Sequence, residues 1–109
     1  MTDKIVVIST CSSAEEAEKL ARSMVEQRLA ACVSVVPRIR SYYRWKDGIE
    51  SAEEYLLVIK SSRERMAELL AALEKEHSYE VPEVLALPVV DGAANYLNWL
   101  QTNLGSETL

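Results

Sequence analysis

Histidine, cysteine and glycine are all scarce in this sequence, which has one, two and three of them in 109 residues. Three glycines leave no phosphate-cradling loop, and neither a G-x-S-x-G nor an H-E-x-x-H motif occurs. A Cys/His pair is the remaining nucleophile arrangement, but nothing in the sequence orients the two side chains. We therefore expect no enzymatic activity and no obligatory cofactor.

The two cysteines, Cys11 and Cys32, form neither a CxxC motif nor a zinc-type spacing. A chain of this length does not need disulfides to bury a core, so the small number of cysteines predicts a reducing compartment. Both thiols are expected to be small buried hydrophobic groups, which is the commonest role of free cysteine.

Long apolar runs and an excess of positive charge are also missing. The first apolar run, Ile5 to Ile8, is too short for a signal-peptide core or a membrane span. Twelve basic and 17 acidic residues give a net charge of −5, which argues against a nucleic-acid partner. No linker or charge block marks a second domain. Residues 1–109 are therefore expected to form one cytoplasmic domain with no membrane partner and a polar tail from about Gly105.

The periodicity of apolar residues predicts how the chain begins. The β-branched segment 4–10 is typical of a buried strand, and the segment 12–29 is typical of an amphipathic helix. Ser13 and Glu16 match a capping box, in which each side chain binds a backbone N–H that the first helical turn leaves open.

From residue 31 the apolar period changes to two, which predicts a strand up to Trp45. Pro37 marks an edge strand or a bulge, because proline cannot donate to a ladder. Asp47-Gly48 predicts a type I′ hairpin turn, from which the segment 51–60 returns as a second long strand. Arginines of the first strand are expected to pair with glutamates of the second, namely Arg38, Arg40 and Arg44 with Glu50, Glu53 and Glu54.

The second half of the chain repeats the strand-helix pattern. Ser61 and Glu64 match another capping box, before an apolar helical stripe over 66–73. A fourth strand over 84–90 and a last helix over 93–100 follow. The order β-α-β-β-α-β plus a helix predicts an α+β fold, the ferredoxin-like sandwich, with two helices on one face of an antiparallel sheet.

One strand of the predicted hairpin is apolar on both sides. The run Leu56–Ile59 leaves neither sheet face polar, which favours self-association through the sheet or its edges. Trp45 and Trp99 stand in elements expected to face another subunit, where tryptophan supplies contact area and one N–H. Both are therefore predicted to be structural.

Four short motifs together resemble the divalent-cation tolerance protein CutA family. The resemblance extends from about Ile5 to Leu104. The first two motifs are an S-x-Y-x-W hairpin (Ser41, Tyr43, Trp45) and a lysine that closes the next strand (Lys60). The other two are a Y-x-x-P-E turn (Tyr79, Pro82, Glu83) and a Y-L-x-W helix (Tyr96, Leu97, Trp99).

The resemblance implies a homotrimer of ferredoxin-like subunits, linked to divalent-metal tolerance and to copper binding. Two departures concern the site. Members often have His-Pro-Tyr where this chain has His77-Ser78-Tyr79, and the metal-linked cysteine of some members aligns with Ser9, two residues before Cys11.

The segment HSYEVPE, residues 77–83, is the main candidate site, because it contains the only imidazole of the chain close to several carboxylates. Imidazole and thiolate ligands favour copper among the divalent cations. We predict a cleft between subunits that holds copper or a similar cation, or a small polar ligand. The predicted metal ligands are His77, Glu76 and Cys11, and the predicted pocket residues are Lys60, Tyr79 and Glu83.

Ordinary roles for these residues stay open at this point. His77 stands at the expected end of a helix, where it could serve as a cap. Lys60 and Glu83 could form a structural ion pair. A second function is also open, that of a trimeric regulator similar to the PII family, with a small molecule or protein bound between subunits. The short acidic hairpin tip of this chain argues against a nucleotide in that role.

Overall fold

The computed structural model describes residues 1–105. The predicted tail begins at Gly105 and otherwise lies outside the described residues. The α+β class and the predicted order of elements are confirmed. The elements are β1 (Lys4–Cys11), α1 (Ala14–Glu26), β2 (Cys32–Trp45), β3 (Gly48–Ser62), a 3-10 turn (Arg63–Arg65), α2 (Met66–Glu76), β4 (Leu85–Pro88) and α3 (Ala94–Asn103).

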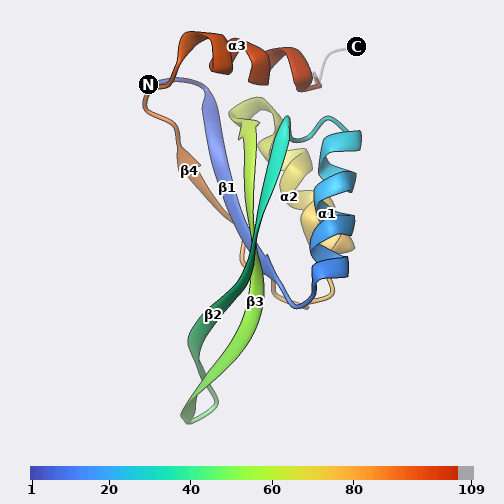
Figure 1. Cartoon of the computed structure of the whole chain (residues 1–109), viewed down its shortest axis with the longest axis vertical. Coiled ribbons are helices and arrows are strands. Elements are labelled where there is room, and N and C mark those ends of the chain that lie inside the picture. Colours follow the sequence, from blue (N-terminus) through green and yellow to red (C-terminus); the bar gives the residue numbers. More distant parts are fainter. Residues whose placement is uncertain (106–109) are drawn as a thin grey trace.

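A four-stranded antiparallel sheet in the order β2-β3-β1-β4 forms the centre of the fold. Helices α1 and α2 lie on one face of this sheet, and α3 lies across its end (Figure 1). β1 pairs with β3 along its whole length, whereas β4 pairs with β1 only from Ile5 to Ile8. β2 and β4 are therefore the edge strands, and the last residues of β1 continue beyond β4.

The core lies between the sheet and the two helices. Alternate residues of β1 and β3, such as Val7, Leu57 and Ile59, are fully buried. They pack against the apolar stripes predicted for the helices, from which Leu20, Met24, Leu69 and Leu73 are fully buried.

The first predicted capping box is confirmed in its first half. Ser13 is the N-cap of α1, and its Oγ accepts a hydrogen bond from the N–H of Glu16 at 3.1 Å. The carboxylate of Glu16 instead receives hydrogen bonds from Ser78, on the turn after α2.

The second predicted capping box is wrong. β3 continues to Ser62, so Ser61 is a buried strand residue whose Oγ donates to the carbonyl of Leu29 at 2.6 Å. α2 begins only at Met66, after the 3-10 turn. The serine that matched a helix cap is instead part of a buried strand.

The β2–β3 hairpin projects beyond the body of the molecule (Figure 1). Its turn is one residue earlier than predicted, because Trp45 pairs with Gly48 and the loop residues are Lys46 and Asp47. Lys46 has a φ of 56°, and Gly48 has no positive φ. The irregularity predicted at Pro37 is confirmed as a shift of register between Val36 and Ile39.

The expected pairing of arginines with glutamates holds only in part. Arg40 stands opposite Glu53 in the register of the hairpin, and its guanidinium donates to Ser51 Oγ at 3.4 Å. Glu54 is buried and receives a hydrogen bond from Tyr79. Glu54 therefore pairs with Tyr79 and not with an arginine of β2.

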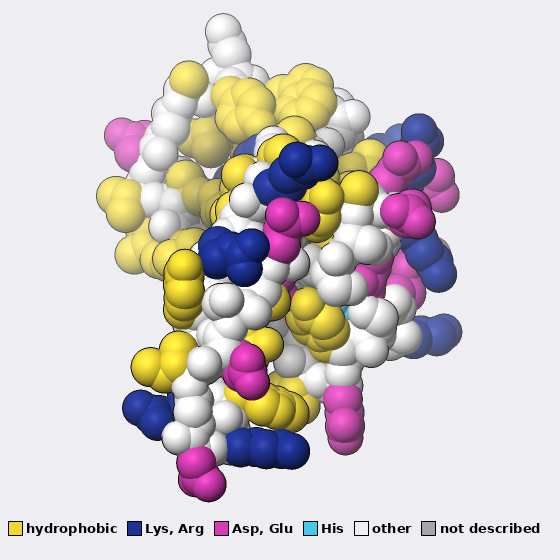
Figure 2. All heavy atoms as spheres, turned by 60° about the horizontal axis from the view of Figure 1, so that its bottom comes forward, with side chains coloured by type: hydrophobic (Ala, Val, Ile, Leu, Met, Phe, Trp, Pro, Cys, Tyr) yellow, Lys and Arg dark blue, Asp and Glu magenta, His cyan; other side chains and the backbone are white. Residues whose placement is uncertain are grey.

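The second sheet face is largely apolar, as the sequence predicts, although Lys60 and Ser34 also lie on it. Leu56 and Val58 are half-buried and, by strand alternation, point away from the buried Leu57. Val36 stands opposite Leu56, and Leu85 stands opposite Ile8. Figure 2, in which the hairpin end comes forward, shows hydrophobic side chains at the surface among charges of both signs.

Candidate functional site

The HSYEVPE segment begins where α2 ends. His77 is the C-cap residue of α2, with extended backbone angles, and its N–H donates to the carbonyl of Leu73 at 2.9 Å. The His77 side chain has no exposed surface. The only imidazole of the chain is therefore an internal group that lies against the end of β1.

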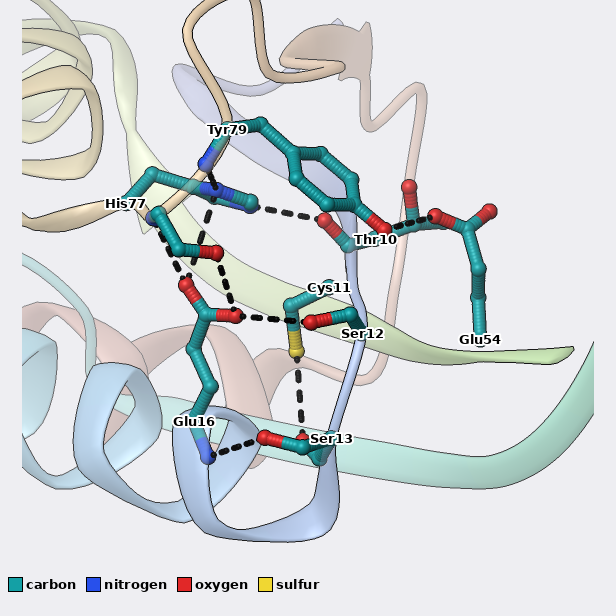
Figure 3. Close-up of polar contacts among 9 residues, drawn as sticks. Thr10, Cys11, Ser12, Ser13, Glu16, Glu54, His77 and Tyr79 are labelled. Atoms are coloured by element: carbon teal, nitrogen blue, oxygen red, sulfur yellow. Dashed lines mark hydrogen bonds and ion pairs between the residues drawn. The ribbon is translucent and has the colours of Figure 1, made fainter. Parts of the chain in front are cut away.

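Both nitrogens of the His77 ring have hydrogen-bond partners (Figure 3). Nε2 lies 2.7 Å from the carbonyl oxygen of Thr10, and Nδ1 accepts the N–H of Tyr79 at 2.9 Å. A carbonyl can only accept and a backbone N–H can only donate. These partners select the neutral imidazole with its proton on Nε2.

Glu16 ties the first turn of α1 to the same segment. Its carboxylate receives the N–H and the hydroxyl of Ser78, each at 2.8 Å, and lies 3.6 Å from Nδ1 of His77. Burial alone raises the pKa of Glu16, but the hydrogen bonds from Ser78 outweigh it and hold the pKa below its ordinary value. A proline at position 78 has no N–H to give, so serine here supplies contacts that the His-Pro-Tyr pattern lacks.

Tyr79 extends the contacts to the hairpin. Its hydroxyl donates to Glu54 Oε2 at 2.8 Å, and Glu54 is 8% exposed. Burial, together with this hydrogen bond and the negative charge of Glu54, raises the pKa of Tyr79 far above its ordinary value. In Figure 3 the phenol points at the carboxylate of Glu54, so Tyr79 acts as a protonated donor.

The predicted metal ligands do not share a site within one chain. Cys11 is fully buried, and burial together with the nearby charge of Glu16 raises its pKa, whereas thiolate is the form that binds metals. The Glu76 carboxylate accepts from Gln27 at 3.2 Å, and the His77 nitrogens are both engaged. In residues 1–105 no group of three or more His, Cys, Asp or Glu side chains is placed to hold a metal ion. His77, Glu76 and Cys11 therefore do not fit a copper site in a single subunit.

Lys60 and Tyr79, two of the predicted pocket residues, are also separated within one chain. The Lys60 ammonium donates to Ser34 Oγ at 2.6 Å and lies 3.7 Å from Cys32 Sγ. Lys60 stands six residues along β3 from Glu54, the partner of Tyr79, which is about 20 Å of extended strand. Glu83 is exposed. Lys60 can approach Tyr79 only if the two residues come from different copies.

Two surface hollows lie away from this segment. One, of about 370 Å³, runs between α1 and the edge strand β2. Its lining is mostly apolar and includes Ala14, Ala21, Val35, Pro37 and Tyr55. Such a surface suits apolar contact rather than the binding of a charged ligand.

Glu16, Glu54 and Ser78 are the site residues that sequence reasoning missed. Glu16 carries a cap signal that explains its position without reference to the turn. Glu53 and Glu54 are adjacent, and strand alternation alone does not tell which of the two turns inward. For Ser78 the one available signal was that serine stands where proline is common in the resembling family.

Among residues 1–105, no helix is both long enough and apolar enough to cross a membrane.

Comparison with known proteins gives consistent matches. Residues 5–103 match the family model described as CutA1 divalent ion tolerance protein. The divalent-cation tolerance protein CutA of Thermus thermophilus is 41% identical over 100 residues, 92% of this chain and 97% of that protein.

Solved structures agree with this match. The crystal structure of CutA from Xylella fastidiosa has a TM-score of 0.93 and 36% identity, over 95% of this chain and all of that one. The periplasmic divalent cation tolerance protein CutA from Archaeoglobus fulgidus has a TM-score of 0.89 and 34% identity, over 92% and 97% of the two chains. Because that relative is described as periplasmic, the cytoplasmic location expected for this chain stays a prediction.

Proposed function

Because this chain belongs to the CutA1 divalent ion tolerance family, we propose that it acts in divalent-cation tolerance as a homotrimer that holds copper or a similar cation at a junction between subunits. The proposal assigns it no catalytic step. Tyr79 is kept protonated, and both nitrogens of His77 are engaged, so neither of these two side chains is free to act as a general base.

The main support for assembly into an oligomer is the apolar sheet face between the two edge strands. Val36, Leu85 and Leu87, on this face, are 42%, 57% and 47% exposed in the single chain. Edge strands offer unpaired backbone groups, and a contiguous apolar patch on a soluble protein usually marks an interface. A closed assembly of identical chains covers both features at once.

The proposal puts the cation between copies because residues 1–105 of one chain do not assemble a set of three or more ligands. Among the predicted residues, Glu83 is exposed and Glu76 is half-buried, so these carboxylates are the donors that the fold leaves accessible. A net charge of −5 also favours cations over anions near the surface. In this proposal Lys60, Tyr79 and Glu83 face the seam from different copies.

Light scattering and calorimetry on the same preparations test the proposal. At micromolar concentration we expect about three chain masses, because the exposed apolar face of one chain must be covered. Val58→Glu places a charge on that face and should give a smaller species, and Glu15→Gln, on the exposed side of α1, is the matched control.

Copper titrations of the two species then test the junction. The wild type should bind Cu(II) more tightly than the Val58→Glu protein, and Glu83→Gln should weaken binding while the mass stays unchanged. A wild-type monomer would contradict the assembly. Equal copper affinity in the trimer and in a folded Val58→Glu monomer would contradict the junction.

A further inference from the structure

The end of β1 lacks a strand on one side. β4 pairs with β1 from Ile5 to Ile8 and goes no further. Two residues beyond, the carbonyl of Thr10 has its hydrogen bond with Nε2 of His77, and Thr10 is 7% exposed. A buried backbone carbonyl needs a partner. The imidazole supplies the bond where the sheet has no neighbouring strand.

The same ring also sets the course of the next residues. Nδ1 accepts the N–H of Tyr79, two positions along the chain, and the two rings lie with their centroids 4.8 Å apart. From this position the Tyr79 hydroxyl reaches Glu54 on β3. The ring thus connects the end of β1 to the phenol-carboxylate pair.

We infer that His77 is a positioning residue, fixed as the neutral Nε2–H tautomer, which closes the end of β1 and holds Tyr79 on Glu54, and that its ring is not a ligand for divalent cations in the folded protein. Coordination needs a free lone pair on a neutral imidazole. In His77 the Nδ1 lone pair is taken by the Tyr79 N–H, and Nε2 carries its proton toward Thr10. A metal at either nitrogen removes the partner of a backbone group beside the fully buried ring.

This inference goes beyond the proposed cation role and holds whether or not the protein binds copper. If Cu(II) is bound between subunits, other donors bind it. The two claims therefore fail separately. Absence of any copper binding contradicts the cation role, and it leaves the assignment of the ring to be decided by direct observation of its nitrogens.

Nitrogen-15 NMR of histidine-labelled wild-type protein makes that observation. The chain has one histidine, so one pair of ring nitrogens is seen. We expect a protonated Nε2 and an unprotonated Nδ1, both unchanged when an equimolar amount of diamagnetic Zn(II) is added. The opposite tautomer, or a Zn(II)-induced shift of either nitrogen, overturns the inference.

Variants test the metal and the positioning claims. His77→Gln keeps an N–H donor for Thr10, and Glu80→Gln, at an exposed position of the same turn, is the matched control. Cu(II) affinity of His77→Gln should stay within about twofold of the wild type, and a loss of more than about tenfold overturns the inference. His77→Gln should also loosen the contact of Tyr79 with Glu54, so Tyr79→Phe should cost less free energy of unfolding in that variant than in the wild type. An equal cost in both backgrounds overturns the positioning claim, and the wild-type ring signals decide the tautomer if the variant does not fold.

Discussion

Two carboxylates outside the HSYEVPE segment hold it in place. Glu16 on α1 receives two hydrogen bonds from Ser78, and Glu54 on β3 receives the hydroxyl of Tyr79. Hydrogen bonds to charged groups are stronger than neutral ones, and a buried polar group that loses its partner is costly. The segment is therefore attached both to the helix layer and to the hairpin.

The lowered pKa of Glu16 predicts a dependence of stability on pH. Its folded pKa lies below the ordinary value of 4.5, so its contribution is fully present above that value and is lost as the pH falls through the folded pKa. Glu16→Gln should therefore lower the melting temperature at about pH 7, and its difference from the wild type should shrink as the pH falls below 4.5. Thermal unfolding followed by circular dichroism measures both. Glu15→Gln, in the same turn but exposed, is the control, and a constant difference between wild type and Glu16→Gln at all pH values would contradict the claim.

Removing the phenol hydroxyl should expose the cost of burying Glu54. Tyr79→Phe leaves the Glu54 carboxylate without its hydrogen-bond donor, which should lower the free energy of unfolding by about 1–3 kcal/mol. Tyr43→Phe, on the exposed part of the hairpin, should change it by less than about 0.5 kcal/mol in the monomer. Urea unfolding measures both variants, and equal effects would contradict a specific role for the Tyr79 hydroxyl.

The helices and strands with strong periodicity were predictable because each signal is local. The stripe of α1 and the two-residue period of β2 follow from residues a few positions apart. The cap predicted at Ser61 failed because its pattern is short and the residue was needed inside a strand that continues to Ser62. Local signals thus identify elements better than they locate their ends.

The site was less predictable because its contacts join distant parts of the chain. Tyr79 and Glu54 are 25 residues apart in sequence, and His77 and Thr10 are 67 apart. The sequence indicated the right segment through its one imidazole. It did not indicate that both nitrogens of that ring have internal partners, which depends on where β4 stops beside β1.

The hairpin turn offers a test of backbone strain at the element scale. Lys46 has a φ of 56°, a conformation that costs a side-chain-bearing residue about 1–2 kcal/mol relative to glycine. Lys46→Gly should therefore stabilise the chain by up to about 1 kcal/mol, after the greater freedom of glycine in the unfolded chain is subtracted. Asp47→Gly, at the neighbouring loop position without a positive φ, should instead destabilise it by about 0.4–1 kcal/mol. Chemical unfolding of both variants measures the difference, and the same sign for both would contradict the assignment of the strain to Lys46.

The whole molecule is elongated, with extents of 46, 26 and 21 Å. The projecting hairpin contributes this length, and it exposes Tyr42, Trp45 and Ile49 at 71%, 59% and 72%. Tyr96 and Trp99 on α3 are stacked and also nearly half exposed. Large aromatic and aliphatic side chains at this density are typical of surfaces that another chain covers. Trp45 and Trp99 are therefore outside the core of one chain, and the structural role predicted for them depends on assembly.

Trp45 is the residue at which a lone chain and a trimer predict the most different effects of mutation. In a lone chain a side chain that is 59% exposed adds little, so Trp45→Ala should change the free energy of unfolding by less than about 0.5 kcal/mol. In a trimer that buries it, the same change should cost about 3–5 kcal/mol per chain. Assembly also makes the melting temperature rise with protein concentration, because subunits bind the folded state. We expect the larger loss and a concentration-dependent melting temperature for the wild type, measured by calorimetry over a hundredfold range of concentration and checked by light scattering. Lys46→Ala, next to Trp45 in the turn, is the control for local damage to the hairpin, and a Trp45→Ala protein with wild-type melting and mass would show that the tryptophan faces solvent.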